Sequence, residues 1–144
     1  KSEEHRALEA KAEADAEAAF DLAMRLFRGD EAIERNSYQA LQWMRRAGDR
    51  GNERAQLALG QLYMSGLEEM GTDLREAERW LNLAAAQGNA EAAELLEEVR
   101  PALADQRAVD QYRQRWYGHA YHYWYSAPIF YYRWLPARRA FVRY

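Results

Sequence analysis

Residues 55–89 read AQLALGQLYMSGLEEMGTDLREAERWLNLAAAQGN, and the segment 18–52 matches this stretch when it is shifted forward by 37 positions. Small and aromatic residues recur at the same places in both copies, at Ala18/Ala55, Leu22/Leu59, Gly29/Gly66, Ala40/Ala77, Trp43/Trp80, Ala47/Ala84 and Gly51/Gly88. A third copy begins with Ala92 and Leu96 and stops at Pro101. Repetition at a period of roughly 20–50 residues is typical of solenoids, in which each unit buries its apolar face against its neighbours. The repeat therefore predicts an all-α solenoid that binds other macromolecules.

Apolar spacing and capping residues predict where the helices lie. Alanine-rich residues 3–28 favour one long helix, polar in its first half, in which His5 is expected to be solvated. Inside the repeats, helices are expected over 37–49, from Asn52 to Ser65, from Asp73 to Gly88, and over about 90–100, where Pro101 ends the last of them. A sixth helix is expected over 102–117.

Small residues on the second helix of each copy allow close helix packing. The alanines at 40, 47, 77 and 84 let antiparallel helices approach each other, and Trp43 and Trp80 have the volume to fill the wedge between successive helix pairs. Both tryptophans are therefore expected in the core.

These landmarks resemble the Sel1-like repeat, an α/α-hairpin related to the tetratricopeptide repeat. The resemblance rests on Ala55, Leu59-Gly60, Tyr63 and Gly66, then on Asp73, Ala77, Trp80, Ala84-Ala85 and Gly88, and it covers about residues 18–100. The first copy departs from the pattern at Ala23, which replaces the glycine after leucine, and at Gly48, which replaces the second alanine. The resemblance implies a right-handed array without its own active site. Its partner would lie in a groove between helix pairs, lined by exposed residues of each first helix such as Arg25, Gln61 and Met64.

Charge and aromatic content divide the chain. All 23 acidic residues and 14 of the 20 basic ones fall within residues 1–110, whereas residues 111–144 hold six arginines, no acid and 13 of the 19 aromatic residues. This contrast predicts a polar helical extension over 1–17, a solenoid with a flanking helix over 18–117, and an aromatic, basic arm over 118–144.

Alternating aromatic residues on either side of Ser126-Ala127-Pro128 predict that the arm forms a β-hairpin, with an extended arm on the solenoid as the alternative. Three roles are open to it: a terminal cap of the solenoid, a docking surface for a protein, or a surface that binds polysaccharide, lipid or nucleic acid. The candidate residues are Arg113, Arg115, Trp116, Tyr121, Trp124, Tyr132, Arg133, Trp134, Arg138 and Arg139.

Catalytic motifs are absent from the sequence. It contains no cysteine, no glycine-rich phosphate loop and no nucleophile or zinc-protease motif. His119 and His122 form an H-x-x-H pair, but no carboxylate in the surrounding segment completes a metal site. We therefore expect a protein that is not an enzyme and that uses neither a metal nor another cofactor.

The expected partner is another protein, with self-association through the arm as a further possibility and nucleic acid disfavoured. No apolar run approaches the roughly 18 residues of a membrane span. Adaptors with such repeats commonly act in bacterial envelope complexes, and 18 arginines beside two lysines fit a GC-rich bacterial coding sequence. The expected location is therefore the periplasm or envelope, with the cytoplasm as the alternative.

Overall fold

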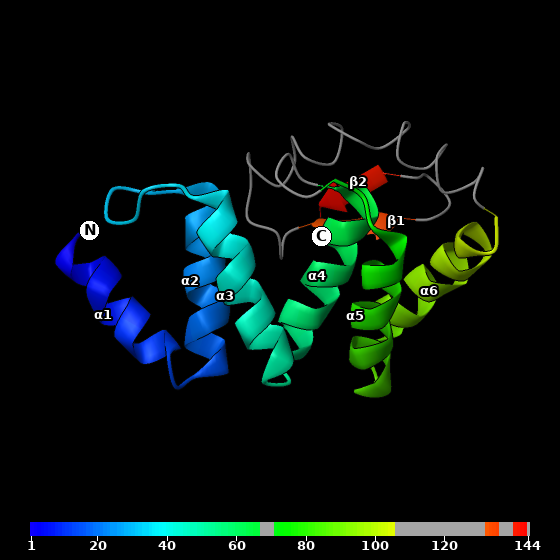
Figure 1. Ribbon diagram of the computed structural model, residues 1–144, viewed down its shortest axis with the longest axis horizontal. Helices are drawn as coiled ribbons and strands as arrows, with labels where there is room; N and C mark the ends of the chain where they lie inside the picture. The colour runs from blue at the N-terminus through cyan, green and yellow to red at the C-terminus, as the bar shows by residue number, and fades with distance from the viewer. Residues whose placement is uncertain (67–70, 106–131, 136–139, 144) are drawn as a thin grey trace.

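The computed structural model describes residues 1–66, 71–105, 132–135 and 140–143. Six helices occupy the first two of these ranges: α1 (Glu3–Ala12), α2 (Ala16–Arg28), α3 (Ser37–Asp49), α4 (Glu53–Ser65), α5 (Leu74–Ala86) and α6 (Ala90–Leu103). Each helix packs against the next one in the chain, so that the helices stand side by side along an arc from α1 to α6 (Figure 1). The predicted all-α solenoid is confirmed.

The helix starts agree with the predicted caps. Side-chain oxygens of Asn36, Asn52, Asp73 and Asn89 accept hydrogen bonds from backbone N–H groups in the first turns of α3, α4, α5 and α6. Such a bond satisfies one of the donors that the start of a helix leaves unpaired. Asn36 and Asp73 lie 37 residues apart, as do Asn52 and Asn89, so the helix starts repeat with the period of the sequence.

The core is a single cluster along the seam between helices, and both repeat tryptophans belong to it. Trp80 is fully buried, and its ring lies so close to Gly48 that a Cβ there would stand 2.7 Å from Trp80 Cζ3. Gly60 is similarly close to Leu81, whose Cδ2 would lie 2.4 Å from an added Cβ. The glycine at 48, a departure from the repeat pattern, thus makes room for the tryptophan of the next repeat.

The single helix predicted over 3–28 is wrong. The chain forms two helices, α1 and α2, and Asp15 caps the second through a bond that its side chain accepts from Glu17 N. Alanine supplies helix propensity throughout, but an aspartate competes for backbone N–H groups and favours a cap. Asp15 lies 37 residues before Asn52, so this break follows the repeat.

The predicted end at Pro101 is also wrong, because α6 continues to Leu103. Pro101 lies in the final turn, where its missing N–H removes one hydrogen bond without splitting the helix, and Ala104 N bonds to Pro101 O at 3.2 Å. Ala102 and Leu103 therefore belong to α6, and the rest of the predicted helix 102–117 falls largely outside the described residues.

Two strands lie in the arm, β1 (Tyr132–Leu135) and β2 (Ala140–Arg143). They pair antiparallel, with Tyr132 opposite Arg143 and Leu135 opposite Ala140. These two strands form a hairpin within residues 132–143. The hairpin predicted around Ser126-Ala127-Pro128 falls largely on residues outside the described ranges and stays a prediction. Pro136 directly follows β1, and proline commonly ends a strand.

Candidate functional site

Two of the three residues predicted to line the groove, Gln61 and Met64, are buried. Gln61 is 3% exposed and Met64 is 1% exposed, and nearly every residue of α4 from Ala55 onward is buried. Arg25 is half-buried, and its guanidinium donates to Asp30 and Glu4. The expectation that Gln61 and Met64 are exposed is therefore wrong, whereas a binding role of Arg25 stays a prediction.

The candidate residues of the arm divide into two groups. Tyr132, Arg133 and Trp134 belong to β1, where Arg133 stands opposite Val142 and Trp134 opposite Phe141. The other candidates lie outside the described residues: Arg113, Arg115, Trp116, Tyr121, Trp124, Arg138 and Arg139. His119 and His122 of the H-x-x-H pair also lie outside them. Their binding roles remain predictions.

Hydrogen bonds between successive repeats recur at two asparagines that lie 37 residues apart. Asn52 and Asn89 cap α4 and α6 with their side-chain oxygens and use their amides to reach the preceding first helix: Asn52 Nδ2 donates to Glu17 Oε1 at 2.8 Å, and Asn89 Nδ2 donates to Glu53 Oε1 at 3.0 Å. The cap residue thus also joins neighbouring repeats.

A second row of contacts joins the C-terminal ends of α1, α3 and α5. Arg50, which follows α3, donates to the carbonyl of Ala12 at 2.8 Å and also to that of Glu13. Gln87, at the equivalent place after α5, donates to the carbonyl of Gly51 at 3.0 Å. Because α1 takes part as α3 does, α1 stands in the position of the second helix of a repeat.

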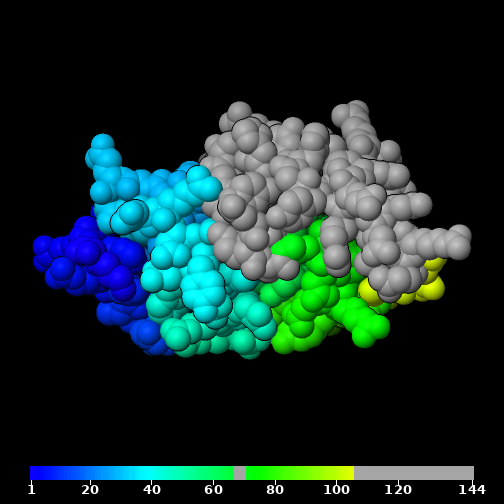
Figure 2. All heavy atoms as spheres, turned by 45° about the horizontal axis from the view of Figure 1, so that its top comes forward, coloured from blue at the N-terminus to red at the C-terminus, as the bar shows by residue number. Residues whose placement is uncertain are grey.

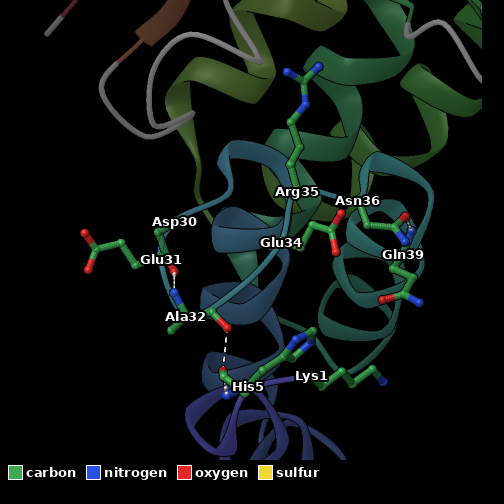
Figure 3. Close-up of a pocket in the computed structure, with 10 residues that line it drawn as sticks. Lys1, His5, Asp30, Glu31, Ala32, Glu34, Arg35, Asn36 and Gln39 are labelled. Carbon is green, nitrogen blue, oxygen red and sulfur yellow. Dashed lines mark hydrogen bonds between the residues drawn. The ribbon is translucent and has the colours of Figure 1, made fainter.

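A polar cleft of about 580 Å³ lies at the α1 end of the array (Figure 3). The start of α1, the loop between α2 and α3, and the first turn of α3 form its walls. His5, which was expected to be solvated, is only 4% exposed and lines this cleft. Figure 2 shows this end of the molecule at the left, with the dark blue atoms of α1 and the lighter blue and cyan loop at the surface.

Asp30 shapes the loop between α2 and α3. Its carboxylate accepts hydrogen bonds from the N–H groups of Ala32 and Ile33, both at 2.9 Å, and from Arg25 Nε at 2.9 Å. The bond from Arg25, aided by the two backbone bonds, lowers the pKa of Asp30 to about 2 against the opposing effect of desolvation. The pKa of Arg25 is raised, chiefly by the same bond. Arg25 also binds Glu4 of α1, so this network holds α1 against the loop.

The network predicts how stability depends on pH. Because the pKa of Asp30 is lower in the folded state, its contribution is complete above about pH 4 and is lost as pH falls towards 2. Wild type should exceed Asp30→Asn in unfolding free energy by at most about 1 kcal/mol near pH 6, since solvent screens the pair, and the difference should shrink below pH 4. Thermal melts between pH 2 and 6 measure it. Asp21→Asn, on exposed α2 surface, is the control. A difference that stays constant over this range would contradict the assignment.

Several arginines cover aromatic rings of the core. The guanidinium carbon of Arg46 lies 4.6 Å from the Trp43 ring centroid, and that of Arg79 lies 4.4 Å from the Trp80 ring. Such stacking is favourable and leaves the arginine head in contact with solvent. Arg46 and Arg79 therefore lie over buried tryptophans of α3 and α5.

Tyr38 and Leu83 are the large apolar side chains that remain exposed among the described residues, at 63% and 42%. Tyr38 stands in the first turn of α3, next to Gln39 of the cleft wall. Sequence reasoning missed Tyr38, although its place two residues before buried Ala40 puts it off the apolar face of the helix. The cleft itself gave no periodic signal, because it combines the loop between α2 and α3 with α1, which lies outside the two matched copies.

Within the ranges that the structure describes, no three histidine, cysteine, aspartate or glutamate side chains gather where they could hold a metal ion. None of the helices described there is long and apolar enough to cross a bilayer.

Comparison with known proteins agrees with the architecture. The Sel1 repeat model matches residues 16–52 and 53–89, slightly more than half of the chain, and the two matches coincide with the helix pairs α2–α3 and α4–α5. A search among curated proteins finds no match. Sel1 repeats are generally non-catalytic modules for protein–protein interaction. By its two repeats and the helix pairs that they form, the chain belongs to the Sel1 repeat family.

Proposed function

We propose that this chain is a non-enzymatic adaptor that holds a protein partner within a bacterial envelope-associated complex. The repeats support the binding role, because the two matched units form one continuous scaffold. The arginine-rich composition supports a bacterial source. The described helices are held together by their own contacts, which suits a scaffold that presents its surface without rearrangement.

Tyr38 carries this proposal. Tyrosine is one of the residues that dominate the binding energy of protein interfaces, and the Tyr38 side chain is 63% exposed on a well-packed helix. Because tyrosine has only two side-chain torsions, it loses little entropy on binding. The next residue of α3, Gln39, lines the polar cleft. We define the docking surface as Tyr38 together with this cleft.

A photo-crosslinking residue placed at Tyr38 is expected to capture one discrete protein in cells of the source organism, because this residue would lie at the centre of the interface. The same residue at Leu83, an exposed apolar position on α5, is the matched control and should capture it weakly or not at all. Tyr38→Ala should weaken binding of the identified partner at least about tenfold. Mass spectrometry identifies the partner, and an envelope protein would fit the proposed setting. Equal capture from both positions would contradict the docking surface.

The alternative is a polysaccharide-, lipid- or nucleic-acid-binding module that acts through the arm. Its support is the composition of residues 111–144, with six arginines and 13 aromatic residues and no acid. Binding of that kind weakens steeply with added salt, because it releases counterions from an anionic polymer or surface. Capture that disappears between low and physiological salt, with no crosslink from Tyr38, would favour this alternative.

A further inference from the structure

Three polar side chains converge on the cleft from three elements without partners of their own. Glu34 comes from the loop between α2 and α3, Gln39 from α3 and His5 from α1 (Figure 3). Among the described residues, no hydrogen bond or ion pair engages the Glu34 or Gln39 side chain, and buried His5 Nε2 also has no hydrogen-bond partner. Polar groups that face one cavity without internal partners are suited to bind a ligand.

The charges around the cleft favour a cation. Lys1 is neutralised by Glu9, with Nζ and Oε1 2.7 Å apart, and Asp30 is neutralised by Arg25. Glu31 and Arg35 also line the cleft and carry opposite charges, and their side chains extend away from His5 and Gln39 (Figure 3). The Glu34 carboxylate then remains as a charge of the cleft that no ion pair within the described ranges neutralises, which favours a cation.

The hydrogen-bonding groups also fit a donor-rich ligand. The Glu34 carboxylate accepts only, the Gln39 amide offers a carbonyl oxygen, and His5 Nε2 accepts when the ring proton is on Nδ1. The N-terminal turns of α1 and α3 at the cleft are already capped, because Ser2 Oγ accepts from His5 N and Asn36 Oδ1 accepts from Gln39 N. A planar group with several N–H donors and a positive charge matches this set.

We propose that this cleft binds the guanidinium group of an arginine side chain from a protein partner. Glu34 pairs with the guanidinium, Gln39 accepts a second N–H, and His5 forms the floor. The inference rests on the proposed function in that it assigns the arginine to a partner protein.

The test is a titration of the full chain with Nα-acetyl-arginine methylamide, followed by NMR at the His5 ring and the Gln39 side-chain amide. Both sets of signals should shift saturably. The citrulline counterpart, which has the same shape without the charge, should leave them in place. Glu34→Gln should weaken arginine binding about tenfold or more. Gln39→Ala should weaken it by a smaller factor, because it removes a neutral acceptor.

Asp21→Asn is the control. It removes the same charge from the exposed surface of α2, and Asp21 is not among the residues that line the cleft, so binding should change less than twofold. Equal binding of arginine and citrulline, or equal loss in the Asp21 and Glu34 variants, would overturn the site. A dimer of the chain alone that Glu34→Gln dissociates in sedimentation would overturn the assignment to a different protein. The arginine probe is titrated onto the chain alone. A negative titration would therefore reject the arginine site, whereas crosslinking at Tyr38 tests the proposed docking surface independently.

Discussion

Trp80→Ala is expected to lower the free energy of unfolding by about 3–5 kcal/mol, the usual loss for a large aromatic side chain removed from a core. Trp80 is fully buried on α5 and its ring rests on Gly48 of the preceding repeat, so the cavity would open between the two repeats. Small domains are stable by only about 5–15 kcal/mol, and the variant should lose a large part of that. Denaturant unfolding followed by circular dichroism measures the loss.

Two control variants separate packing from other causes. Leu83→Ala on the same helix removes a side chain that is largely exposed, and it should change stability by less than about 0.5 kcal/mol. Trp80→Phe should lose much less than the alanine variant. The phenylalanine variant loses no hydrogen bond, because Trp80 Nε1 has no hydrogen-bond partner within the described part of the chain. Equal losses from the phenylalanine and alanine variants would contradict a role in filling volume.

Gly60→Ala is expected to destabilise the protein, although alanine is the better helix former by about 1 kcal/mol. A Cβ on Gly60 would lie against Leu81 Cδ2 and 2.5 Å from Leu81 Cγ, so the buried Leu81 side chain would have to move from its place or α4 and α5 would have to separate. Overpacking of this kind costs typically about 1–3 kcal/mol, which outweighs the gain in propensity. Chemical denaturation of the variant gives the sign directly.

A double-mutant cycle identifies the contact responsible. Leu81→Ala alone should be destabilising because it creates a cavity, but in combination with Gly60→Ala the new methyl group occupies part of the space that Leu81 leaves. The double variant should therefore be more stable than the sum of the two single losses predicts. Additive losses would show that contact with Leu81 does not cause the destabilisation by Gly60→Ala.

The periodic residues made the solenoid predictable. Capping residues such as Asn52 and Asp73 bond to the first turn of their own helix, so the sequence around them is enough to predict the helix start. Trp80 fills space in the core, and its position repeats that of Trp43 after 37 residues. The break at Asp15 escaped prediction because the surrounding alanines favour helix on either side. Its signal, a position 37 residues before Asn52, required extending the repeat beyond its apolar landmarks.

The candidate site was less predictable, for reasons that concern tertiary structure. Gln61 is a polar residue that suggests an exposed face, but α4 lies inside the array and is buried along most of its length. His5 lies in a helix with little apolar face, and it is buried because α1 packs on α2 beside the loop that contains Asp30. The convergence of Glu34 with His5 depends on that loop, whose path no periodicity describes.

The asparagines that begin α4 and α6 have a consequence for how the array comes apart. Each uses one side-chain amide both to start its own helix and to bind the repeat before it, so a unit that detaches also weakens the cap of the helix that follows. Solenoid stability is the sum of unit and nearest-neighbour terms. Here the two terms share the same atoms, which makes partial opening at an interior unit costly. Melting should then progress from the ends inward, as a zipper opens, and the central α3–α4 junction should be the last part to exchange its amide protons.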